Sequence, residues 1–70
     1  MKEFAIEEGQ PYVELIRLLK AMRIAESGGQ AKMMVNDGCV RVNGELEYRK
    51  RKKLRPGDKV EIFDETIKIR

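Results

Sequence analysis

The chain has 70 residues, and its 15 Lys and Arg against 12 Asp and Glu give a formal net charge of +3. It has no His and a single Cys, which excludes histidine-based catalysis, histidine metal sites, internal disulfides and four-cysteine zinc sites. A chain this short forms one domain, residues 1–70, with little surface left for a deep pocket. We therefore expect a binding module without catalytic residues, metal or cofactor, and not an enzyme.

The N-terminus and the hydropathy pattern suggest a location. The first ten residues include three acidic residues and no apolar stretch longer than Phe4-Ala5-Ile6, unlike a secretory signal. No apolar run approaches the roughly 18 residues of a membrane span. We expect a cytoplasmic monomer that does not associate with membranes.

The charges are unevenly distributed along the sequence. The segment from Arg17 to Arg55 holds eleven basic and four acidic residues, a net of +7, and the rest holds four basic and eight acidic residues, a net of −4. This split favours a cationic face that binds a polyanion. The alternative is an ordinary solvated surface.

The N-terminal part predicts a short strand and then a helix. Phe4–Ile6 is the expected strand, followed by a turn. A helix is expected over about Pro11–Met22, because proline is tolerated in a first turn. Apolar residues fall on one face of this helix at a spacing of 3.6 residues; they are Tyr12, Leu15, Ile16, Leu18, Leu19 and Met22.

A second helix is expected to begin after Ser27. Ser27 and Gln30 have the spacing of a capping box, in which the hydroxyl accepts an N–H near the helix end and the amide reaches back. The helix should end at Asn36-Asp37-Gly38, because glycine suits the left-handed position after a last turn.

After Gly38 the pattern changes from helical to alternating. Asn43-Gly44 is a strong hairpin signal, and Arg55–Asp58 predicts a further turn. The expected strands are Cys39–Val42, Glu45–Tyr48, Lys59–Ile62 and Thr66–Ile69. The predicted class is α+β, with two helices packed on a small, mainly antiparallel sheet of four to five short strands.

Four segments in this order resemble the S-four RNA-binding domain, also called the alpha-L motif. The resemblance covers residues 12–62. Within this family, the chain is similar to the small stand-alone, YbcJ-like form found in bacteria. The matching segments are Leu15-x-x-Leu18-Leu19-Lys20, Ala25-Glu26-Ser27-Gly28-Gly29-Gln30-Ala31-Lys32, Gly38-Cys39-Val40-Arg41-Val42-Asn43-Gly44 and Pro56-Gly57-Asp58-Lys59-Val60.

The resemblance implies that RNA lies against the second helix and the adjoining loop. Many S-four domains carry an arginine soon after the helix-opening serine, where this chain has Gly28 and Gly29, so backbone N–H groups are expected to contact phosphate there. Carried over by position, the RNA-binding residues are Ser27, Gly28, Gln30, Lys32, Arg41, Arg49, Lys50, Arg51, Lys52 and Lys53.

The residues themselves predict a similar surface. Structured RNA is recognised mostly through phosphate and 2′-hydroxyl contacts, which need cations and polar donors. The run from Arg49 to Lys53 supplies charge density, and Lys20, Arg23 and Lys32 would extend it if the two helices pack as a hairpin. We expect Phe4, Tyr12 and Phe63 to fill the core, and Tyr48 to be the one aromatic that could stack on a base.

The sequence therefore predicts a non-enzymatic protein that binds structured RNA, with ribosomal or transfer RNA as the expected target. Two alternatives remain open. The basic face could dock an acidic protein, as in an adaptor, or the chain could be the targeting subunit of an RNA-modifying enzyme. The ribosome or such an enzyme is therefore a further candidate partner besides RNA.

Overall fold

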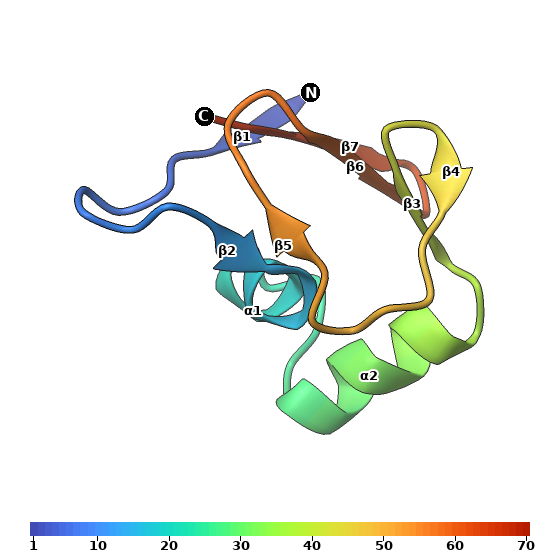
Figure 1. Ribbon diagram of the computed structural model, residues 1–70. Coiled ribbons are helices and arrows are strands. Elements are labelled where there is room, and N and C mark those ends of the chain that lie inside the picture. The colour runs from blue at the N-terminus through green and yellow to red at the C-terminus, as the bar shows by residue number, and fades with distance from the viewer.

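The computed structural model describes all 70 residues, which form a mixed five-stranded sheet, a two-stranded sheet and two helices (Figure 1). The five-stranded sheet has the order β1-β7-β6-β3-β4, in which only β1 and β7 pair in parallel. Its strands are β1 (Lys2–Phe4), β3 (Val40–Val42), β4 (Glu45–Leu46), β6 (Lys59–Ile62) and β7 (Glu65–Ile69). The second sheet pairs β2 (Val13–Glu14) with β5 (Lys53–Leu54), and the helices are α1 (Leu15–Ala21) and α2 (Gly28–Asn36). The predicted α+β class is confirmed.

A single core lies between the larger sheet and the helices. It contains 13 buried hydrophobic residues from both helices, from β3, β5, β6 and β7, and from the segment between the helices. Alternation along β3 buries Val40 and Val42 and leaves Arg41 exposed, as expected for a strand with one covered face. Neither helix is long enough to cross a membrane.

The first helix begins at Leu15 and not at Pro11, so the predicted start was wrong. Residues 13–14 instead pair with Lys53–Leu54 as β2. The periodicity of residues 12–22 is compatible with helix, but the pairing with β5 supplies backbone partners that local sequence does not reveal.

Both helices end in the same backbone arrangement, with a left-handed residue after the last turn. After α2, Gly38 has φ +75°, and the N–H of Cys39 donates to the carbonyl of Met34 at 3.2 Å. After α1, Arg23 takes the left-handed position with φ +60°, and the N–H of Ile24 donates to Leu19 at 3.0 Å. The predicted end of α2 is therefore confirmed, whereas an arginine replaces the usual glycine after α1.

The predicted cap of α2 is confirmed with one difference. Ser27 Oγ accepts the N–H of Gln30 at 3.1 Å. The Gln30 side chain accepts the N–H of Glu26, one residue before the cap, and not that of Ser27.

The Asn43-Gly44 hairpin is confirmed, and Asn43 also connects it to the Arg55–Asp58 turn. Both turn residues have positive φ, at 52° and 87°. Asn43 Nδ2 donates to Asp58 at 3.0 Å, and Asn43 Oδ1 accepts the N–H of Lys59 at 2.9 Å. Burial acts to raise the pKa of Asp58, but hydrogen bonds from the Arg55 N–H and from Asn43 outweigh it, so this pKa is lowered.

The aromatic residues only partly follow the prediction. Phe4 is half-buried and packs against the core, and Tyr12 is also half-buried. Phe63 is not in the core: the residue is 66% exposed and its φ is +54°. It lies in the two-residue loop between β6 and β7, so the strand alternation used in the prediction does not extend to it.

Candidate nucleic-acid interface

The run from Arg49 to Lys53, which we call the basic loop, is fixed by the start of α1. The N–H of Leu15 donates to the carbonyl of Lys52 at 2.9 Å, and the N–H of Ile16 donates to the carbonyl of Lys50 at 3.1 Å. The first N–H groups of a helix have no acceptor within the helix, so the basic loop supplies this cap. The positive end of the helix dipole also faces these carbonyls. The cationic segment is therefore attached to the core through its backbone, while most of its side chains remain exposed.

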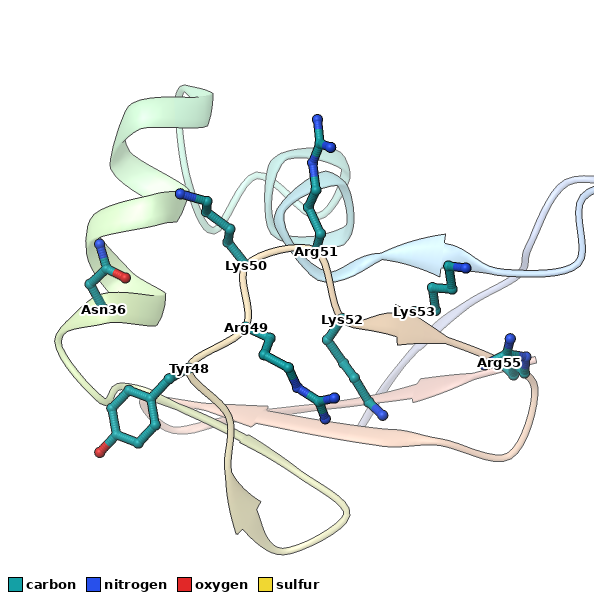
Figure 2. Close-up of a pocket in the computed structure, with 8 residues that line it drawn as sticks. All are labelled: Asn36, Tyr48, Arg49, Lys50, Arg51, Lys52, Lys53 and Arg55. Carbon is teal, nitrogen blue, oxygen red and sulfur yellow. The ribbon is translucent and has the colours of Figure 1, made fainter.

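The basic loop lines an open cavity of about 590 Å³ (Figure 2). Six of its eight lining residues are basic and none is acidic; the eight are Asn36, Tyr48, Arg49, Lys50, Arg51, Lys52, Lys53 and Arg55. Lys50 and Arg51 extend to the side on which the helices lie, whereas Arg49 and Lys52 extend toward the sheet (Figure 2). A concave surface with this lining concentrates positive potential and attracts an anionic ligand.

Within the basic loop, Arg49 differs from its neighbours because it is paired with Glu47. Its Nε and Nη2 atoms lie 2.9 and 3.1 Å from the two carboxylate oxygens, and its N–H donates to the same carboxylate at 3.0 Å. The hydrogen bonds from the Arg49 side chain lower the pKa of Glu47 against the opposing effect of burial. The same pairing raises the pKa of Arg49. Part of the Arg49 charge is thus already compensated within the chain.

The other basic residues between Arg17 and Arg55 make no ion pair. The chain contains three salt bridges, Lys2–Glu65, Arg49–Glu47 and Arg70–Glu3. Of the eleven basic residues from Arg17 to Arg55, only Arg49 takes part in a salt bridge. The predicted excess of positive charge is therefore not neutralised within the fold.

Lys53 and Arg55 share one aromatic neighbour. The Lys53 Nζ lies 5.0 Å and the Arg55 Cζ 5.9 Å from the centre of the Tyr12 ring, within the range of cation–π interactions. The sequence prediction did not include Arg55. Leu54 is a buried strand residue, so alternation places its two neighbours on the same outer side.

The predicted residues on and between the helices lie at the surface of the helix hairpin. α1 and α2 pack against each other, and the side chains of Lys20, Arg23, Gln30 and Lys32 are exposed. The N–H groups of Gly28 and Gly29 have no acceptor in the chain, and a Cβ at Gly28 would meet no atom within 4 Å. The backbone at the start of α2 is therefore open to solvent.

Arg41 is separated from this group. Its neighbours in β3 point into the core, so its own side chain lies on the face of the sheet opposite the core. There it donates to the carbonyl of Gly44 at 3.3 Å. The helices and the basic loop thus lie to one side of the sheet and Arg41 on the other.

The remaining chemistry of the chain is limited. No three His, Cys, Asp or Glu side chains come together as metal ligands. Cys39 is a free, half-buried thiol. The cavity, whose lining contains six cations and no carboxylate, is suited to holding an anion in place.

Comparison with known proteins identifies the class of this fold. The family model of the S4 domain matches residues 4–70, and the chain belongs to this family. The predicted S-four resemblance is confirmed.

Individual relatives are small bacterial proteins. The chain is 41% identical over 59 residues to the "Putative RNA-binding protein YbcJ" of Escherichia coli (strain K12), covering 84% of each chain. A Shigella flexneri protein, also named YbcJ, matches with the same identity and coverage. The solution structure of Escherichia coli YbcJ, described as having an alfaL motif involved in RNA-binding, superimposes with a TM-score of 0.74 at 38% identity. That match covers 99% of this chain and 86% of YbcJ.

Proposed function

We propose that this protein binds RNA, without catalysing a reaction, through a surface formed by the basic loop and α2. The observation that carries the proposal is the cavity lined by six cations, of which only Arg49 is paired. Membership of the S4 domain family and the RNA binding given for YbcJ support it. Contacts of Lys and Arg with phosphates supply a large share of the affinity of such surfaces, and a cation without an ion pair is free to make them.

The finer parts of the proposal concern the target. We propose structured RNA, ribosomal or transfer RNA, bound in the cytoplasm by a monomer of this chain. Apart from Arg49, the cations of the basic loop have no ion pair, and the backbone of this loop is hydrogen-bonded to the start of α1. Such cations suit the phosphates of structured RNA, which is recognised mostly through phosphate and 2′-hydroxyl contacts. Arg41 contributes less to this surface than the basic loop does, because it lies on the other side of the sheet.

The test compares two pairs of substitutions that change the net charge equally. Lys50→Gln with Arg51→Gln should weaken binding to a structured RNA and flatten the salt dependence by roughly 0.7–0.9 per lost phosphate contact. Lys59→Gln with Lys68→Gln is the matched control. These two lysines are opposite each other on β6 and β7 and are exposed outside the cavity.

The measurement is the dissociation constant at several salt concentrations, with thermal unfolding as a check that every variant folds. The control pair should leave the affinity and slope close to those of the parent. Equal losses in the two pairs would mean that only net charge matters, and the proposed surface would be rejected. An adaptor that recognises an acidic protein would show no salt-dependent binding to purified RNA.

A further inference from the structure

Two members of the cavity lining, Asn36 and Tyr48, are not cationic. Both line the end of the cavity beside α2, with Lys53 and Arg55 at the other end, and the Tyr48 ring extends outward from the basic loop (Figure 2). Asn36 is the last residue of α2 and is exposed. Tyr48 follows β4 and is 57% exposed. This end of the cavity therefore offers an amide and an aromatic ring next to a row of cations.

The ring of Tyr48 lies beside the glycine that follows α2. A Cβ built at Gly38 would be at ordinary van der Waals distance from this ring, 3.4 Å from the hydroxyl oxygen and 3.6 Å from Cε1. Gly38 also has the left-handed conformation that favours glycine after a helix. Tyr48 is 57% exposed, so its ring is accessible to a ligand. A tyrosine side chain has only two rotatable χ angles, so it loses little conformational entropy when a ligand stacks on it.

The chemistry of the two ends is complementary to a single nucleotide. An aromatic face stacks on any base, and a side-chain amide can both donate to and accept from a base edge. The adjoining cations suit the phosphates on either side of that base. The volume of about 590 Å³ is within the roughly 300–1,000 Å³ of small-molecule sites.

We propose that this cavity holds one unpaired nucleotide of a structured RNA, with its base stacked on Tyr48 beside Asn36 and its flanking phosphates on the basic loop. This inference rests on the proposed function and adds which feature of the RNA is recognised. A base within a continuous helix has both faces covered by its neighbours. A bulged or loop base is already unstacked, so bringing it onto Tyr48 has a smaller cost.

The test uses two RNA hairpins with the same number of phosphates, one fully paired and one with a single bulged nucleotide. The parent protein should bind the bulged hairpin on the order of tenfold more tightly, which corresponds to one base–aromatic stack. Tyr48→Leu should remove this preference, and Tyr48→Phe should retain it. With 2-aminopurine as the bulged base, the parent should quench its fluorescence on binding and Tyr48→Leu should not.

Phe63→Asn is the matched control, since Phe63 is an exposed aromatic outside the cavity lining. It should keep both the preference and the quenching. Equal affinity of the parent for the two hairpins, or an unchanged preference in a folded Tyr48→Leu variant, would overturn this inference and leave the proposed RNA binding intact. Absence of salt-dependent binding to either hairpin would overturn the proposed function and this inference together.

Discussion

Glu47 is the only charged residue buried in the fold, at 9% exposure. Its position next to the basic loop gives it a local role, because it orients Arg49 through two side-chain hydrogen bonds and one backbone hydrogen bond. A buried carboxylate needs such partners to offset its desolvation. The sequence could not show this pairing, since neighbouring opposite charges are common and only the fold buries one of them.

Glu47→Gln should therefore lower stability and strengthen RNA binding. The free energy of unfolding at pH 7 should fall by about 1 kcal/mol, because a charge-assisted hydrogen bond is replaced by a neutral one. The released Arg49 should steepen the salt slope by up to roughly 0.7–0.9. Glu45→Gln is the control, since Glu45 is exposed and makes no ion pair. A parallel change in both variants would contradict the specific role of the pair.

The same pair predicts a pH dependence. The pKa of Glu47 is lowered in the folded chain, so its contribution to stability is present above the ordinary glutamate pKa and is lost as the pH falls through the lowered value. Denaturant unfolding should show the parent and Glu47→Gln converging in stability below a pH of about 4.5, the ordinary pKa. A stability difference that stays constant between pH 7 and pH 3 would contradict the assigned cause.

At the scale of elements, the features set by local sequence were predictable. The Ser27 cap, the glycine after α2 and the Asn43-Gly44 turn each depend on residues within about five positions of one another, and all three are confirmed. The pairing of β2 with β5 joins residues about forty positions apart and left no local signal. This pairing moves the start of α1 and places the basic loop at its first turn.

The end of α1 is the exception among the local features, because Arg23 occupies a conformation that favours glycine. A left-handed conformation costs a non-glycine residue roughly 1–2 kcal/mol, and strained positions gather at functional sites. We expect Arg23→Gly to raise the free energy of unfolding by about 0.5–1 kcal/mol after the greater flexibility of unfolded glycine is subtracted. The same substitution should weaken RNA binding through loss of the charge.

Arg23→Asn separates the two effects, since asparagine tolerates this conformation without a positive charge. Both variants should lose the same RNA affinity in a titration at fixed salt, and Arg23→Gly should have the higher unfolding midpoint. Unchanged affinity in both variants would place Arg23 outside the RNA surface and leave its conformation without a functional explanation.

At the scale of the whole molecule, the charge pattern could be predicted from the sequence but its arrangement could not. The excess of cations between Arg17 and Arg55 is evident from counting. Their division between the two sides of the sheet follows from the alternation along β3, which sends Arg41 away from the helices. The lining of the cavity combines residues from α2, the basic loop and β5, and these meet only through the tertiary fold.

This arrangement predicts a preference for folded RNA over an unstructured strand. The cations of the basic loop stand on a backbone that is hydrogen-bonded to the start of α1, so their points of attachment are fixed although their long side chains are flexible. A folded RNA presents its phosphates in a fixed array, whereas a flexible strand must lose conformational entropy to match these positions. A hairpin that contains an unpaired base should therefore bind more tightly than an unstructured strand of equal length.

Competition at fixed salt measures this preference, because both competitors then carry the same number of phosphates and differ only in their arrangement. Exchanging base pairs while keeping the fold should change the affinity by less than tenfold, about 1.4 kcal/mol, since stacking on Tyr48 tolerates any base and the cations contact phosphate. An unstructured strand that competes equally well would show that the fixed backbone of the basic loop confers no selectivity. A larger loss on exchanging base pairs would require a side chain that reads base edges within the helix.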